Sequence, residues 1–233
     1  MSEASVPIAA GETLSRNMII KLRRSYVTCT LIAVNTTMFL LTANPFPFLI
    51  SKAALDMFAL NPAFVLKGDK LYTLITSMFL HGSFLHLLGN MLFLWIFGRD
   101  VEARLRTIRF LALYLGSGLF SCFVGLAAYS LPTLGASGAI SGIMGSTLIL
   151  FPKTRIKLIF IPRIKAMSVP KRISATYIVP VPKRFVAMVL WFIYQFLLAF
   201  IGSVGVGYWV HVGGFAFSIL IIVEALIWRV EGK

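Results

Sequence analysis

The chain has 233 residues, of which 58% are hydrophobic and only 13% are charged, and its mean hydropathy is +0.88. An ordinary globular domain has about 25% charged residues, so this composition excludes one and indicates a membrane protein. The net charge of +14 could suggest a nucleic-acid partner, but the basic residues lie between apolar runs, so we expect none.

Six apolar segments can be marked as membrane helices, each approaching the roughly 20 residues that a spanning helix needs. In chain order they are 26–43, a segment that starts between 71 and 84 and ends at 98, 108–129, 134–151, 185–201 and 208–228. The connection from Asn44 to about Lys70 is apolar and holds three prolines, so we expect it to lie in the membrane interface. The sequence therefore predicts an all-α, six-transmembrane-helix bundle over residues 26–229, with tails at 1–25 and 230–233.

The basic residues orient these six segments. Cytoplasmic loops of membrane proteins carry an excess of Lys and Arg. With six spans, 19 of the 22 basic residues fall on one side, and nine of them lie in the 152–184 loop, which holds no acid. Both termini are then predicted to be cytoplasmic. The N-terminus has no signal-peptide pattern, so we expect a prokaryotic plasma membrane, with an organelle left open.

Polar side chains gather at one depth of the predicted bundle. His86 and Asn90 lie near the start of the second span, Ser137 opens the fourth, and His211 opens the sixth. These three spans all enter the membrane from the side opposite the basic loops, so the four residues share a depth just below that surface. Polar groups at membrane depth are costly and are usually functional.

Small residues indicate which of these helices touch. Two small-xxx-small pairs occur, Gly138 with Gly142 on the fourth span and Gly214 with Ser218 on the sixth. Such pairs let helix backbones approach closely in a membrane. A close approach would bring the Ser137 hydroxyl within about 2.6–3.2 Å of a ring nitrogen of His211.

This set of residues has the parts needed for acyl transfer. A neutral imidazole can take the proton of a serine hydroxyl and make it a nucleophile. The tetrahedral intermediate needs preorganised donors, which His86, the Asn90 amide and the backbone N–H of Ser137 could supply. Glu224, the one acid within a span, lies about 20 Å deeper than His211. The sequence therefore predicts a Ser137–His211 dyad without an acid.

Each residue taken alone also has a structural interpretation. We expect His81 to bond backbone at the end of the second span and Ser141 to pack against a neighbouring helix. Three histidines could bind a metal ion, but the sequence has no HExxH motif. It also offers no cysteine or carboxylate close to the histidines that could complete a set of metal ligands. We therefore expect no metal and no cofactor.

Three segments resemble the signature segments of rhomboid intramembrane serine proteases. They are HGSFLHLLGNMLFLWIFGRDVE, GASGAISGIMG and GYWVHVGGFAF, which follow the family order on the second, fourth and sixth spans. The resemblance runs from about Leu71 to Phe217. It implies Ser137 as nucleophile, His211 as general base and acid, and oxyanion-hole roles for His86 and Asn90.

The resemblance also implies an activity: a serine endopeptidase that cuts transmembrane segments of membrane-protein substrates near the extracellular membrane face. The bilayer and these substrates are the expected partners. It further implies that Glu102 and Arg104 match a position that braces the cytoplasmic end, and that the fifth span with the 202–207 loop forms a gate. We assign structural roles near the site to five residues: His81, Gly135, Gly138, Gly142 and Gly214.

The chain departs from the family pattern at a position that bears on the site. Family members often carry an aromatic residue four positions after the serine, packed against the histidine; here that residue is Ser141. What holds the His211 ring is therefore open. Two alternatives to a protease also stand: an inactive rhomboid-like protein, which would normally lack the serine or the histidine, and a small transporter, which would need polar residues through the full membrane depth.

Overall fold

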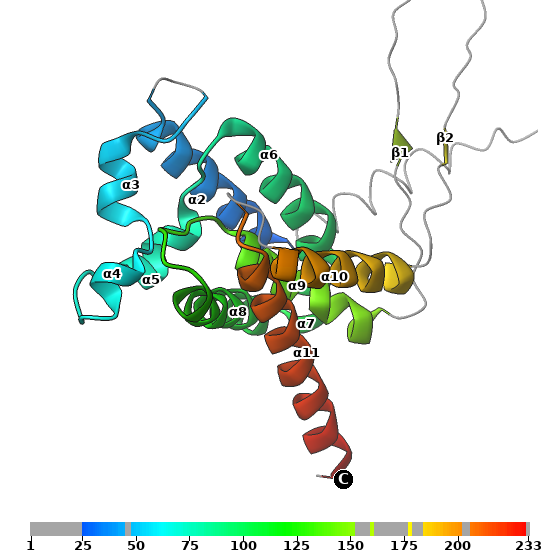
Figure 1. Cartoon of the computed structure of the whole chain (residues 1–233). Helices are drawn as coiled ribbons and strands as arrows, with labels where there is room; N and C mark the ends of the chain where they lie inside the picture. The colour runs from blue at the N-terminus through cyan, green and yellow to red at the C-terminus, as the bar shows by residue number, and fades with distance from the viewer. Residues whose placement is uncertain are drawn as a thin grey trace, which may run out of the picture.

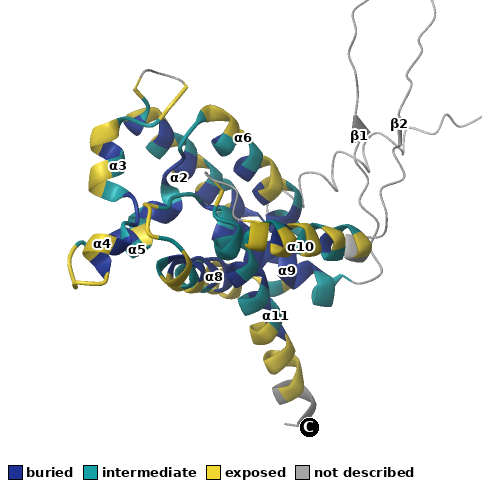
Figure 2. Ribbon diagram, viewed as in Figure 1, coloured by how far each residue is buried: buried dark blue, intermediate teal, exposed yellow. Residues whose placement is uncertain are grey.

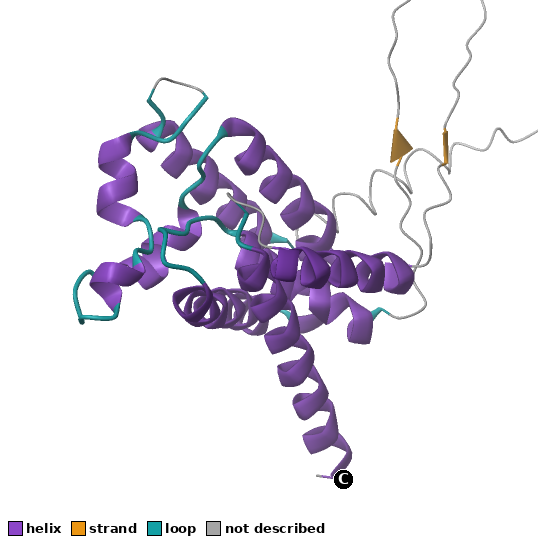
Figure 3. Cartoon of the chain, viewed as in Figure 1, coloured by secondary structure: helices purple, strands orange, loops and turns teal. Residues whose placement is uncertain are grey.

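A computed structural model describes residues 25–44, 48–151, 159–160, 177–178, 184–201 and 206–231. Over these residues the chain consists of helices joined by loops, as predicted, and of the two-residue strands β1 (Ile159–Phe160) and β2 (Tyr177–Ile178), which pair antiparallel (Figure 3). The 1–24 tail, the rest of the 152–183 basic loop and residues 202–205 of the predicted gate lie outside the described residues.

The longer helices follow the predicted segments (Figure 1). They are α2 (Tyr26–Thr42), α6 (Phe84–Phe93), α8 (Thr107–Ala128), α9 (Ser137–Leu150), α10 (Arg184–Ile201) and α11 (Tyr208–Glu231). Short helices fill the connection between α2 and α6: α3 (Lys52–Phe58), α4 (Pro62–Val65), α5 (Thr73–Thr76) and η1 (Ser77–Phe79). α11 runs to Glu231, so the predicted tail boundary at residue 229 falls inside a helix.

Within the described residues, three helices are long and apolar enough to cross a membrane: Phe84–Leu105, Thr107–Ala128 and Tyr208–Ile227. The other three predicted spans correspond to shorter apolar helices, Tyr26–Thr42, Ser137–Leu150 and Val186–Ile201. The chain is therefore a helical membrane protein, while the count of six spans stays a prediction.

The second predicted span is longer than its apolar segment. Helix α6 passes through a π-helical turn, η2 (Leu94–Gly98), directly into α7 (Arg99–Leu105). The Arg99 guanidinium lies over the Trp95 ring, 4.2 Å from its centroid, so the first charged residue after Gly98 is accommodated within the helix. The helix ends instead at Leu105, because the next residue, Arg106, has a φ of 68° that breaks it before α8. The predicted end at Gly98 marked the end of the apolar run and not of the helix.

Glu102 joins this extended helix to the start of α2. Its carboxylate is buried and accepts hydrogen bonds from the backbone N–H of Val27 at 2.9 Å and of Thr28 at 2.8 Å, and from the Thr28 hydroxyl at 2.7 Å. The N-cap residue Ser25 makes no side-chain cap bond, so Glu102 satisfies amides that the first turn of a helix leaves open. Arg104, the other residue that the resemblance assigned to this bracing position, is exposed.

Helix α9 lies at the centre of the bundle, against α8, α10 and α11 (Figure 1). Every residue from Gly138 to Thr147 is buried, and the ribbon beside the α9 label is dark blue in Figure 2. Its glycines allow this: a Cβ atom at Gly142 would overlap the Ser117 side chain of α8 and lie 3.1 Å from the carbonyl oxygen of Gly214 on α11. Small side chains on α9 therefore let two neighbouring helices approach its backbone.

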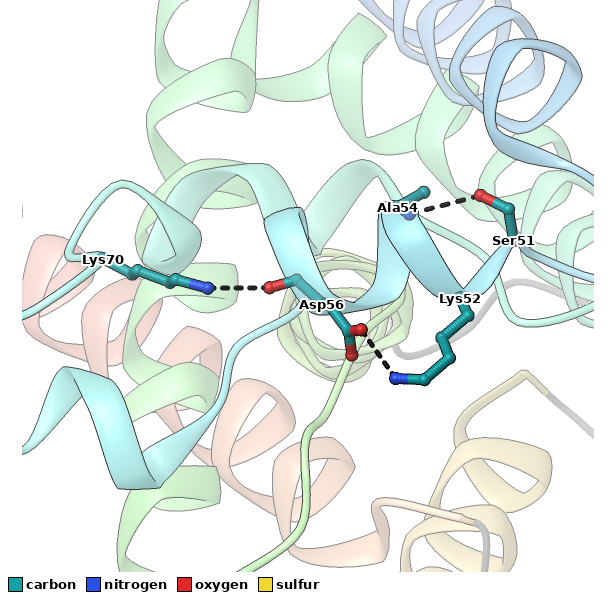
Figure 4. Close-up of polar contacts among 5 residues, drawn as sticks. All are labelled: Ser51, Lys52, Ala54, Asp56 and Lys70. Atoms are coloured by element: carbon teal, nitrogen blue, oxygen red, sulfur yellow. Dashed lines mark hydrogen bonds and ion pairs between the residues drawn. The ribbon is translucent and has the colours of Figure 1, made fainter.

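The α2–α6 connection is folded and joined to the rest of the chain. Ser51 caps α3, and Asp56 pairs with Lys52 at 2.7 Å, while the Lys70 ammonium donates to the Asp56 carbonyl oxygen at 2.9 Å (Figure 4). Two reciprocal backbone hydrogen bonds of 2.9 Å link Leu60 to Thr133, just before α9. The connection predicted to be interfacial thus helps to fix the loop that leads into α9.

Candidate active site

The structure brings Ser137 and His211 together. Ser137 is the first residue of α9, and His211 lies in the first turn of α11. The distance between Ser137 Oγ and His211 Nε2 is 2.9 Å, within the range of a hydrogen bond, and both residues are partly exposed. The serine hydroxyl can therefore donate to an unprotonated Nε2.

This short distance follows from a close backbone contact between Gly138, which directly follows Ser137, and Gly214, one turn after His211. Gly214 lies three residues after His211, and a Cβ atom there would overlap the carbonyl oxygen of Gly138 and lie 2.9 Å from its carbonyl carbon. On the other side of α9, a Cβ atom at Gly138 would overlap the Ser121 hydroxyl of α8. The missing side chains set how closely Ser137 and His211 approach.

His86 reaches the same place from α6. A Cβ atom at Gly135 would lie 2.9 Å from Cε1 and 3.0 Å from Nε2 of His86, and 3.7 Å from Ser137 Oγ. The imidazole and the serine hydroxyl therefore both lie against Gly135. This glycine has a φ of +124°, which side chains disfavour, and its N–H donates to the Ser77 carbonyl oxygen at 2.9 Å.

Asn90 lies one turn after His86 on α6 and is 8% exposed. Residues four apart share a helix face, so both side chains belong to the same side of α6. The Nδ2 group of Asn90 is buried and makes no hydrogen bond with any residue that the structure describes. A buried donor without an acceptor is rare and is available to a ligand.

His81 is fully buried behind His86. The two rings meet edge to face, with centroids 5.1 Å apart. Neither ring nitrogen of His81 makes a hydrogen bond with any residue that the structure describes, so the expected bond to the backbone is not found. The buried ring packs against His86 instead.

Three residues that the sequence left unassigned surround the His211 ring. The other ring nitrogen, Nδ1, lies 2.8 Å from Gln195 Oε1 on α10. The rings of Trp191 and Tyr208 have centroids 6.1 and 6.3 Å from that of His211. Gln195 could have been noticed as an amide in an otherwise apolar segment, but nothing in the sequence placed it beside His211.

Ser141 does not take the place of the missing aromatic residue. Its hydroxyl donates to the Ser137 carbonyl oxygen at 2.6 Å, so it bonds within its own helix. The side chain is buried and does not contribute a ring against His211. In the part of the chain that the structure describes, no group of three or more His, Cys, Asp or Glu side chains could hold a metal ion.

Comparison with known proteins identifies the family. The Rhomboid domain family matches residues 68–226, which is more than half of the chain. The chain belongs to the rhomboid family. This confirms the resemblance seen in the three signature segments.

Several curated rhomboids are similar to part of the chain. The presenilin-associated rhomboid-like protein of Homo sapiens mitochondria is 31% identical over 138 residues, which cover 57% of this chain and 35% of the relative. The mitochondrial Rhomboid protein 1 of Saccharomyces cerevisiae is 40% identical over 97 residues, covering 39% and 28%. The mitochondrial RHOMBOID-like protein 6 of Arabidopsis thaliana is 37% identical over 109 residues, covering 46% and 36%. The match therefore spans about a third of these relatives.

The expectation of a prokaryotic plasma membrane is wrong. The relatives reported above are all named as mitochondrial. The distribution of Lys and Arg separates the two sides of a membrane, but it does not identify which membrane is crossed. The expectation of cytoplasmic termini is wrong for the same reason, and the placement of both termini on the side of the basic loops stays a prediction.

Proposed function

We propose that this chain is an intramembrane serine endopeptidase. The observation that carries the proposal is the 2.9 Å distance between Ser137 Oγ and His211 Nε2 in a chain of the rhomboid family. A serine hydroxyl is a weak nucleophile until a base removes its proton. Here the base is within hydrogen-bond distance before any substrate is bound.

In the proposed reaction, Ser137 Oγ attacks the carbonyl carbon of the scissile peptide bond while its proton passes to His211 Nε2. The tetrahedral intermediate collapses as the imidazolium returns this proton to the leaving amine. Water, deprotonated by the same imidazole, then hydrolyses the acyl-enzyme and restores the serine. Nucleophile, general base and general acid are thus supplied by two residues.

The oxyanion of the intermediate would be held by three donors. The His86 ring lies beside Ser137 across Gly135, and the buried Nδ2 of Asn90 has no hydrogen-bond partner among the described residues. The Ser137 N–H belongs to the first turn of α9, where helix amides have no intrahelical acceptor. Donors fixed in a water-poor site stabilise developing charge more than they would in water.

The proposed substrates are transmembrane segments of other membrane proteins. Ser137 and His211 lie at the start of α9 and α11, on the side that the six-span prediction places opposite the basic loops. Cleavage is therefore expected just below that membrane face. The names of the relatives support a mitochondrial membrane. An antibody raised against the chain should detect it in purified mitochondria, and its recovery in another membrane fraction would contradict this.

The decisive experiment is labelling with a fluorescent fluorophosphonate, which reacts with activated serines, together with a gel assay on a model transmembrane substrate. The purified chain should be labelled and should cut the substrate. Ser137→Ala and His211→Ala should abolish both signals. Ser146→Ala, the same substitution on a buried serine elsewhere in α9, is the matched control and should retain them. Labelling that survives in Ser137→Ala would refute Ser137 as the nucleophile. A folded wild type that neither labels nor cuts would refute the proposal in favour of an inactive rhomboid-like protein.

A further inference from the structure

The amide of Gln195 occupies the place at which an acid would orient the histidine in a catalytic triad. His211 Nε2 lies 2.9 Å from Ser137 Oγ, and its Nδ1 lies 2.8 Å from Gln195 Oε1. The imidazole is therefore bound at both nitrogens, by side chains of two different helices, α9 and α10. In Ser-His-Asp sites the third residue holds the correct tautomer and ring orientation.

Burial distinguishes Gln195 from its neighbours on α10. Its side chain belongs to a residue that is 7% exposed, whereas Tyr194 is 57% and Leu197 is 57% exposed. A glutamine in an apolar helix is costly in a membrane unless its amide is bound, and such residues usually face the protein interior. The apolar residues of α10 suit a membrane environment. The Gln195 amide does not, and its hydrogen bond to His211 gives a reason for its presence.

The chemistry of the amide determines the proton arrangement. A carbonyl oxygen only accepts hydrogen bonds, so His211 Nδ1 must carry a proton to be bonded to it. In a neutral imidazole the other nitrogen, Nε2, then carries the lone pair. This is the tautomer that can accept the Ser137 proton. Without an acceptor at Nδ1, part of the population would place the proton on Nε2 and could not act as a base.

We propose that Gln195 is a positioning residue that fixes the Nδ1–H tautomer and the orientation of His211; this rests on the proposed protease function. It accounts for the absence of an aromatic residue at Ser141, because the ring is held by a hydrogen bond instead of by stacking on α9. A neutral acceptor also avoids burying a carboxylate, which is costly in a low-dielectric site.

Three other side chains around His211 must be considered when its proton affinity is interpreted. His86 shares the site from α6, and the Tyr208 ring meets the His211 ring edge to face at 6.3 Å. Trp191, at 6.1 Å on α10, carries no titratable proton in this range. The Gln195 variants leave all three in place, so a change in pH profile reports the Nδ1 partner.

The test compares Gln195→Met, which keeps the side-chain length but has no amide, with Gln195→Glu, which restores an acceptor as a carboxylate. Gln195→Met should lower kcat on a model transmembrane substrate by about 10- to 100-fold with KM unchanged, because general-base catalysis is impaired and binding is not. Gln195→Glu should recover much of kcat and move the rising limb of the pH–rate profile to higher pH, since a carboxylate stabilises the imidazolium. Leu111→Met, an exposed substitution on α8, should change neither.

A spectroscopic readout separates this proposal from the proposed function. In ¹⁵N-histidine NMR of the detergent-solubilised chain, wild-type His211 should show a protonated Nδ1, and Gln195→Met should shift the ring toward the Nε2–H form. A wild-type His211 protonated on Nε2 would overturn the proposal even if the variants failed to fold. Full activity and an unchanged pH profile in folded Gln195→Met would overturn it while leaving the protease assignment intact. Conversely, loss of the protease function would appear as unlabelled Ser137 in the wild type, whatever the tautomer.

Discussion

At the scale of single residues, Glu102 shows how one buried carboxylate can join two helices. It accepts three hydrogen bonds from Val27 and Thr28 at the start of α2. Glu102→Gln keeps the shape of the side chain but replaces one carboxylate oxygen by an NH2 group. This group cannot accept the hydrogen bonds that Val27 and Thr28 donate. We expect the free energy of unfolding to fall by about 1–3 kcal/mol. Thermal unfolding in detergent micelles measures this loss.

The control for Glu102→Gln is Asp56→Asn, which breaks an exposed pair with Lys52 (side chains 61% and 85% exposed). Exposed pairs contribute little, so no measurable change is expected. An unchanged melting temperature in Glu102→Gln, or an equal drop in both variants, would contradict the bracing role.

Gly135 shows how a single missing side chain can shape a site. Gly135→Ala introduces a methyl group 2.9 Å from the His86 ring, on a backbone whose φ is +124°. The methyl should displace His86 and lower the rate of Ser137 labelling by at least about tenfold, while the chain stays folded. Labelling kinetics with the fluorophosphonate measure the effect.

The matched control for Gly135→Ala is Gly68→Ala in the connection after α4. Gly68 also has a positive φ, +87°, but a Cβ atom there would meet no atom within 4 Å. Gly68→Ala should carry a similar backbone strain of about 1–3 kcal/mol and leave labelling unchanged. If both variants label equally slowly, backbone strain and not contact with His86 is the cause.

At the scale of helices, the close contact between α9 and α11 determines the distance between Ser137 and His211. Gly214→Ala places a methyl against the Gly138 backbone, which cannot move aside as a side chain can. Overpacking of this kind costs about 1–3 kcal/mol, and it would also separate Ser137 from His211. We expect a lower melting temperature together with slower labelling of Ser137.

Gly89→Ala in α6 is the control for this helix contact. A Cβ atom at Gly89 would meet nothing within 4 Å. Because alanine favours a helix over glycine by up to about 1 kcal/mol, the melting temperature should rise or stay the same, and labelling should not change. A Gly214→Ala chain as stable and as reactive as Gly89→Ala would mean that the close contact does not determine the site.

At the scale of the whole molecule, six spans make a prediction about sidedness. A membrane-impermeant maleimide should distinguish two groups of single cysteines, introduced after Cys29 and Cys122 are replaced by serine. Lys67→Cys and Ser130→Cys should react from one side of sealed vesicles, and Arg104→Cys, Lys165→Cys and Lys233→Cys only after permeabilisation, or the reverse for inverted vesicles. Any mixing of the groups would exclude six spans.

The helices and their approximate ends could be predicted from the sequence, because an apolar run followed by charge is a local pattern. The segment predicted at 108–129 corresponds to helix α8 (Thr107–Ala128), and the segment predicted at 208–228 corresponds to helix α11 (Tyr208–Glu231). The local pattern failed where a charged residue is accommodated by its neighbours. The second helix continues through a π-helical turn to Leu105, with the Arg99 guanidinium over the Trp95 ring.

The candidate residues could also be selected from the sequence, since Ser137, His211, His86 and Asn90 are polar groups at one expected depth of an apolar chain. Membership of the rhomboid family was readable from the same segments. The sequence did not reveal which membrane holds the chain. The distribution of Lys and Arg distinguishes the two sides of a membrane but not one cellular membrane from another.

By itself, the amino-acid sequence determined that the chain is helical, that a bilayer is its solvent and which polar residues are unusual there, because each of these depends on composition and local spacing. Only the tertiary structure decided what those residues touch. The 2.9 Å from Ser137 to His211, the contact of His86 with Gly135 and the bond of Gln195 to Nδ1 join helices that are far apart along the chain. Such contacts depend on how closely whole helices pack, and that distance is set by glycines and neighbours acting together.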